Sequence, residues 1–171
     1  MTIWKKQLEV MMAFAIYFFI GWLTIICFFV QKKKYSIVEN TVLILSVLII
    51  NLNWTWLVYE EFELITYSRE PWDFVAYLIK RSIVIPVIVL ICLNFGRKQS
   101  SLVKKLMHIL VSSLVILGIT IISHLLKVTT VKHWSIFYDL VYYLLLHLVV
   151  LGIHKWYQTY MVDKEKEVLT K

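Results

Sequence analysis

The chain has 171 residues, of which 60% are hydrophobic and only 17% are charged, and its formal net charge is +7. Soluble domains contain about half apolar and about a quarter charged residues, so this composition excludes an ordinary soluble domain and indicates an integral membrane protein. The lysines flank apolar runs, where they set orientation and contact anionic headgroups, so the basic charge does not predict nucleic-acid binding.

Five apolar runs follow one another along the chain and predict five transmembrane helices. Each has about 20 residues or more, enough for a helix with a rise of about 1.5 Å per residue to cross a hydrocarbon core of about 30 Å. Helices satisfy their own backbone hydrogen bonds in lipid, so the predicted fold class is an all-α integral membrane protein with a five-helix bundle. The predicted spans are 10–30, 37–59, 74–95, 106–126 and 134–156, within a bundle over 1–158 that is followed by a charged cytoplasmic tail, 159–171.

The first run follows Lys5 and Lys6 and ends in Gln31 and three lysines. It is longer than the apolar core of a typical signal peptide and lacks a small-residue cleavage site, so we expect it to be retained as a span.

The distribution of basic residues predicts which way the chain is threaded. Cytoplasmic loops carry an excess of Lys and Arg. In the five-span arrangement, 5 of these residues lie on the side of the N-terminus, and 11 lie on the side of the first loop, the third loop and the tail. We therefore expect the N-terminus outside the cell and the C-terminus in the cytoplasm.

The second run places polar side chains near its outer end. Asn53 lies six residues from Tyr59, which is about 9 Å along a helix, and Asn51 lies slightly deeper. Glu60 and Glu61 follow at the end of the run, and Glu60 is seven residues from Asn53, on nearly the same helix face.

The third run contains two adjacent cations, Lys80 and Arg81. Residues 82–95 alone would span only about 21 Å, so the helix must begin near Phe74 and include both cations. A lone cation in lipid costs roughly 2.5–3.5 kcal/mol, and it therefore either extends to the outer face or pairs with a group on another helix. Pro86 is predicted to kink the helix and to free a carbonyl.

The fifth run contains Asp139 at a depth similar to that of the polar residues above, since Asp139 lies five residues from Trp134 at the start of the run. Lys80 or Arg81 is expected to meet Asp139 or Glu60 between helices. The predicted outer polar cluster consists of Asn53, Glu60, Lys80, Arg81 and Asp139.

Asp139 also begins a stripe on the fifth run, because titratable residues recur after it at intervals of four, four and seven. One interpretation is a proton or ion path. The other is that these groups form hydrogen bonds with neighbouring helices and fix their packing, which we favour. The further members of the stripe are Tyr143, His147 and His154. The fourth run carries a looser polar stripe, which would face the first one if the two helices pack together, and it consists of His108, Ser112, Thr120 and His124.

No motif of a hydrolase, metalloprotease, nucleotide-binding protein or dinucleotide-binding protein occurs in the sequence, and no catalytic, cofactor-binding or metal-binding residue is predicted. The abundance of lysine over arginine and the scarcity of glycine suggest an AT-rich bacterial genome. The predicted function is that of a non-enzymatic accessory or interaction component of the bacterial cytoplasmic membrane. Its expected partners are the lipid bilayer and either another membrane protein or further copies of the chain. The alternative is a transport, permeation or ligand-binding protein in which the outer cluster opens as a pocket.

Overall fold

The computed structural model describes residues 3–97 and 101–169, with side chains over 11–97 and 101–161, and is about 82% helical. Within the described residues, five helical segments are long and apolar enough to cross a membrane, namely Met11–Val30, Ile37–Glu61, Pro71–Gly96, Leu102–Leu125 and Ile136–Met161. The elements in chain order are α1 (Ile3–Val30), α2 (Ile37–Trp56), η1 (Leu57–Glu61), β1 (Ile65–Tyr67), α3 (Pro71–Ile79), η2 (Lys80–Val84), α4 (Ile85–Gly96), α5 (Leu102–Leu125), β2 (Thr129–Val131) and α6 (Ile136–Leu169).

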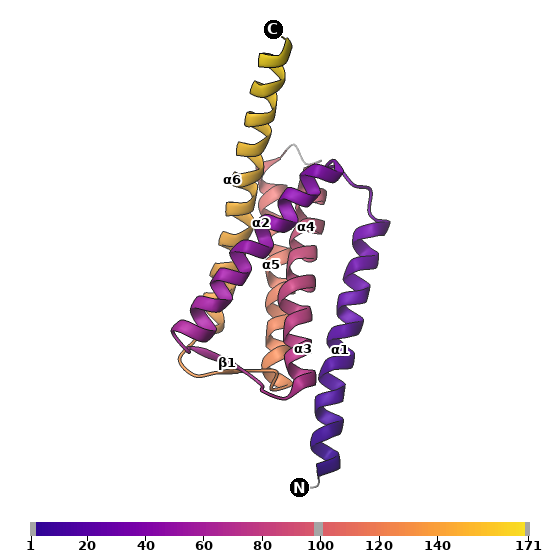
Figure 1. Cartoon of the computed structure of the whole chain (residues 1–171), viewed down its shortest axis with the longest axis vertical. Coiled ribbons are helices and arrows are strands. Elements are labelled where there is room, and N and C mark those ends of the chain that lie inside the picture. The colour runs from indigo at the N-terminus through magenta and orange to yellow at the C-terminus, as the bar shows by residue number, and fades with distance from the viewer. Residues whose placement is uncertain (1–2, 98–100, 170–171) are drawn as a thin grey trace.

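The helices form a bundle in which α4 lies near the centre and contacts α1, α2 and α5. Helix α6 packs against α2 and α5, and α1 runs beside α3 (Figure 1). The start of α1 and the end of α6 lie at opposite ends of the bundle, as an odd number of passes requires. The last helix continues to Leu169, so most of the predicted charged tail prolongs the fifth span as a helix. Residues 170–171 lie outside the described residues.

Helix α1 packs closely against α3 at Gly21. Gly21 is buried, and a Cβ atom built at this position would lie 3.0 Å from Cγ2 of Ile79. Small residues allow helices in lipid to pack closely, since dispersion contacts rather than hydrophobic burial hold them together there. Gly21 therefore lets α1 lie against the rest of the bundle.

Loops at one end of the bundle pair as a short antiparallel ladder, which the sequence analysis did not predict. Strand β1 pairs with β2 so that Ile65 lies opposite Val131 and Tyr67 opposite Thr129. Ile65 of β1 is buried, while Thr130 of β2 is exposed. The ladder connects the ends of α2 and α5 to the starts of α3 and α6 (Figure 1).

The outward faces of the helices are apolar. Phe18, Phe19 and Trp22 on α1 and Leu114 on α5 are all exposed. Monomeric soluble proteins rarely expose continuous apolar faces of this kind, which suit contact with lipid chains. The five candidate spans together with these faces suggest a multi-pass membrane protein.

Candidate functional site

The third helical segment changes its winding where the two cations occur. In η2 the N–H of Ile85 donates to the carbonyl of Lys80, five residues earlier, as in a π-helix. The same pattern would require an N–H at Pro86 for the carbonyl of Arg81, and proline has none. The Arg81 carbonyl instead accepts a hydrogen bond of 2.8 Å from Nδ2 of Asn51 on α2.

Asn51 also joins α2 to α6. Its Oδ1 accepts a hydrogen bond of 2.9 Å from the hydroxyl of Tyr142, whose ring stacks on Trp54 with 4.5 Å between centroids. The backbone carbonyl of Asn51 accepts from the hydroxyl of Thr55 at 2.8 Å. Asn51 thus connects three helical segments at one level of the bundle.

Lys80 and Asp139 are buried beside this connection, with 3% and 6% of their surfaces exposed. Both line a cavity of about 20 Å³, which has room for about one water molecule. Within the described residues no carboxylate oxygen lies within 4.0 Å of the Lys80 ammonium. Lys80 and Asp139 therefore form no direct ion pair, but their opposite charges still attract each other beside the cavity. The indole N–H of Trp134 lies next to the Asp139 carboxylate.

Arg81 points along a different face from Lys80. It is half-buried, its guanidinium lies 5.3 Å from the centre of the Tyr77 ring, and Nη1 lies 3.5 Å from the Tyr77 hydroxyl. Adjacent helical residues point about 100° apart, and at this position both side chains still reach the same cavity.

The structure does not bring Asn53 and Glu60, which the sequence places in the outer cluster, together with Lys80 and Asp139. Asn53 is exposed, and its Nδ2 donates to the carbonyl of Ile49 on its own helix at 2.7 Å. Glu60 is also exposed, and its carboxylate, hydrogen-bonded to the Tyr67 hydroxyl, raises the pKa of Tyr67 above its usual value. Both residues have the expected depth but lie on the outward face of the helix, and Asn51 takes the inward position.

The stripe on α6 is buried and forms hydrogen bonds with neighbouring helices. The Tyr143 hydroxyl lies 2.7 Å from Oγ1 of Thr120 on α5. Nδ1 of His147 lies 2.7 Å from the Tyr143 carbonyl, and Nε2 lies 2.9 Å from the Ser112 hydroxyl. A carbonyl can only accept, so Nδ1 donates, and in a neutral imidazole Nε2 then accepts from Ser112.

Apart from His147, the buried residues of α6 between Tyr143 and His154 are apolar and form part of an apolar layer. Leu146 and Val150 occupy this part of α6 and are fully buried. They belong to a core cluster that also includes Leu43 and Val47 of α2, Leu90 of α4 and Ile116 of α5. This layer separates the Lys80 cavity from the polar groups around His154.

His154 belongs to a polar cluster at the opposite end of the bundle that the sequence analysis did not identify. Its Nε2 donates to Oε1 of Glu39 at 3.2 Å, and Nε2 of Gln158 donates to the same oxygen at 2.9 Å. Arg97 forms an ion pair with Glu39 at 3.2 Å. Glu39 also accepts from the backbone N–H of Ser36, whose side chain caps the start of α2.

The Ser-x-x-Glu sequence at residues 36–39 is a capping-box signature, so this helix start could have been found in the sequence. The convergence of Arg97, His154 and Gln158 on Glu39 could not, because these residues come from helices far apart along the chain.

Next to Glu39, a second set of hydrogen bonds connects the first loop to α2 and α4. Asn94 donates to Oδ1 of Asn40 at 2.9 Å, and its own Oδ1 accepts from the backbone N–H of Lys34 at 2.9 Å. Asn40 donates to the carbonyl of Tyr35 at 2.9 Å. Burial raises the pKa of the Tyr35 phenol above its usual value, and Arg97 beside it partly offsets this effect.

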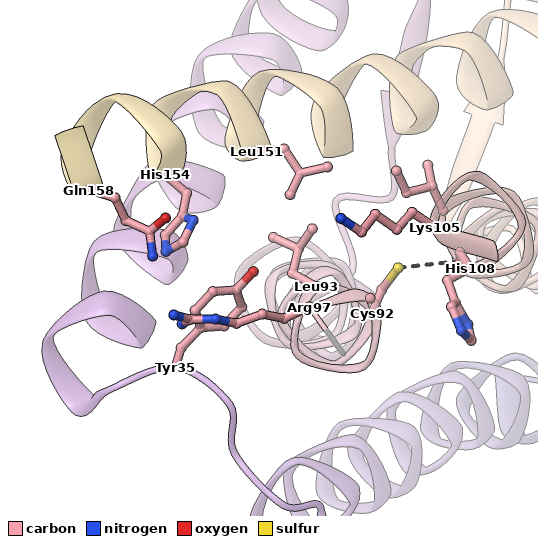
Figure 2. A pocket seen from close by; sticks show the side chains of 11 residues that line it. Tyr35, Cys92, Leu93, Arg97, Lys105, His108, Leu151, His154 and Gln158 are labelled. Atoms are coloured by element: carbon pink, nitrogen blue, oxygen red, sulfur yellow. Dashed lines mark hydrogen bonds between the residues drawn. The ribbon is translucent and has the colours of Figure 1, made fainter. Parts of the chain in front are cut away.

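A pocket of about 170 Å³ opens beside this network. Figure 2 shows Arg97 above the Tyr35 ring, and the guanidinium lies 4.6 Å from the ring centre. Lys105 extends from α5 into the pocket, and His154 and Gln158 enter it from α6 (Figure 2). Among the described side chains, no group of three or more His, Cys, Asp and Glu residues converges as metal ligands would.

Comparison of the chain with protein-family models, curated proteins and solved structures finds no match. Arguments about its function therefore depend on its own residues and their geometry.

Proposed function

We propose that the chain is a multi-pass protein of a bacterial cytoplasmic membrane, with its N-terminus outside and its C-terminus in the cytoplasm. The orientation is supported by the excess of Lys and Arg at the end of the bundle that contains Arg97 and Lys105. The β1–β2 ladder then lies outside the cell, and the Lys80 cavity lies in the outer half of the bilayer.

Reporter fusions test this orientation. Fusions after Lys34, Lys105 and Lys171 are expected to give cytoplasmic reporter activity, and a fusion after Arg69 is expected to give periplasmic activity. The opposite pattern at Lys34 and Arg69 would invert the proposed threading.

Within this membrane the protein acts as a non-enzymatic accessory or interaction component. The observation that supports this function best is the size of the cavity between Lys80 and Asp139, which at about 20 Å³ is far too small for a substrate. Ligand pockets usually have volumes of about 300–1,000 Å³. The buried charges therefore serve the packing of the helices around them.

The stripe on α6 supports the same interpretation. Tyr143 and His147 have partners on α5 or on their own backbone, and the apolar residues Leu146 and Val150 flank His147 along α6. A continuous ion or proton path would need a connected series of polar groups or waters along this route. The protein acts instead through its contacts with a second membrane component or with lipids.

A flux measurement distinguishes this function from the alternative, in which the outer cluster belongs to a permeation route. The full chain is reconstituted in proteoliposomes, and proton and chloride fluxes are followed with dyes sensitive to each ion. The wild-type protein and the Lys80→Leu, Asp139→Leu double variant are both expected to match protein-free liposomes. A wild-type flux that the folded double variant abolishes would overturn the accessory function.

A further inference from the structure

The pocket beside Arg97 lies where headgroups of the inner leaflet would be in the proposed orientation. It is formed at the end of α4, at the start of α5 and near the end of the fifth span, with Gly96, Lys105 and Gln158 among its lining residues. Its volume of about 170 Å³ is below that of a typical pocket for a whole drug-sized ligand. The pocket is therefore suited to one polar group of a larger molecule.

Among the described side chains that line the pocket, Lys105 has no carboxylate partner. Glu39 is the nearby carboxylate, and it is already engaged by Arg97, His154 and Gln158. No carboxylate of the described part of the chain lies within 4.0 Å of the Lys105 ammonium, although Lys105 extends into the pocket (Figure 2). An anionic group in the pocket would therefore meet a free ammonium, with Arg97 nearby as a second cation.

An apolar groove continues from this pocket along the outside of the bundle. It has a volume of about 410 Å³, lies between α1, α4 and α5, and shares Cys92 and His108 with the pocket. In Figure 2 the His108 ring points away from Lys105, on the side of the groove. The two spaces are thus adjacent, one polar and one apolar.

The groove has the length of one leaflet. Its lining residues on α5 run from His108 to Ile119, which is about 16 Å along the helix, and the hydrocarbon core of one leaflet is about 15 Å thick. Val111 and Val115, which line it, are 54% and 49% exposed, so the groove is open to the lipid side. An acyl chain whose headgroup occupies the pocket would follow this path.

We propose that the protein binds one anionic phospholipid from the inner leaflet at this place. Its phosphate contacts Lys105 and Arg97 in the pocket, and one acyl chain lies in the groove between α1 and α5. A zwitterionic lipid is disfavoured because its headgroup brings a cation to a pocket that already has a free ammonium. This binding site goes beyond the accessory function and is tested independently of it.

Native mass spectrometry of the full chain, titrated with phosphatidylglycerol or phosphatidylcholine, provides the test. One phosphatidylglycerol is expected to remain bound under conditions that remove phosphatidylcholine. Lys105→Gln should weaken phosphatidylglycerol binding about tenfold because a charge-assisted contact is lost. Lys104→Gln removes the same charge from an exposed neighbour outside the pocket and should leave binding within about twofold. Equal effects of the two variants, or equal retention of the two lipids, would overturn the proposal.

A second pair of variants tests the groove. Val115→Trp fills it and should also weaken phosphatidylglycerol binding about tenfold. Leu114→Trp places the same ring on an exposed position that lines neither space, and binding should be unchanged. Circular dichroism and thermal unfolding confirm that each variant is folded. If glycerol phosphate without acyl chains binds as tightly as phosphatidylglycerol, the site takes a soluble anion and the lipid assignment is wrong.

Discussion

Asn51 on α2 donates a hydrogen bond of 2.8 Å to the carbonyl of Arg81, and this carbonyl has lost its helical partner because Pro86 has no N–H. The same side chain accepts from the Tyr142 hydroxyl on α6 at 2.9 Å. One amide thus satisfies a backbone group and a phenol, and both would otherwise be buried without a partner. Such groups are costly inside a bundle surrounded by lipid.

Asn51→Leu should therefore destabilise the protein by about 1–3 kcal/mol, because it leaves the Arg81 carbonyl and the Tyr142 hydroxyl unsatisfied. The matched control is Asn53→Leu, since Asn53 is exposed and bonds only to its own helix. We expect that change to be neutral or slightly stabilising. Reversible unfolding in mixed micelles measures both, and an equal loss in the two variants would contradict the assigned role of Asn51.

The contrast between these two asparagines shows that the sequence predicts the depth of a residue along a helix but not the direction in which it points. Depth along a helix follows from residue count, and it placed Lys80, Asp139 and the asparagines at one level. Direction around the helix does not follow from apolar periodicity in this chain, because the outward faces are apolar as well. The polar residues Asn40, Asn51 and Thr55 are all buried on α2, and their spacing was the available signal for its inward face.

Other features depend on tertiary structure. The π-helical winding of η2 and the pairing of β1 with β2 leave no local pattern that predicts them. The cluster around Glu39 assembles side chains from α2, from α6 and from Arg97, which directly follows α4. The candidate spans, in contrast, follow from length and composition alone, because few arrangements other than helices bury so many apolar residues in lipid.

Gly21 provides a prediction about the attachment of α1. Gly21→Leu should destabilise the protein by about 1–3 kcal/mol, since the added side chain would overlap Ile79 on α3. The comparison is Gly118→Leu on α5, where an added Cβ would meet nothing within 4 Å. Thermal unfolding followed by circular dichroism measures the difference. Equal tolerance of both changes would show that the contact between α1 and α3 is not tight.

Two carboxylate–cation pairs allow a test of the Glu39 cluster. Glu39 is largely buried and has four partners, namely Ser36, Arg97, His154 and Gln158. Glu63, in contrast, forms a single exposed pair with Lys132 at 3.4 Å. Glu39→Gln should cost about 1–3 kcal/mol, because several charge-assisted contacts weaken together. Glu63→Gln should cost about 0–1 kcal/mol. Chemical unfolding in detergent measures both values, and a larger cost for Glu63 would refute this ranking.

The structural role of the buried charges is tested most directly by a double-mutant cycle on Lys80 and Asp139. The free energy of unfolding is measured for the wild-type protein, Lys80→Leu, Asp139→Leu and the double variant. Each single change should cost about 3 kcal/mol, because it leaves one charge buried without its partner. The double variant should lie within about 1 kcal/mol of the wild-type protein. If the losses of the single variants simply add in the double variant, the two charges do not stabilise each other across the cavity, and the packing role assigned to them is wrong.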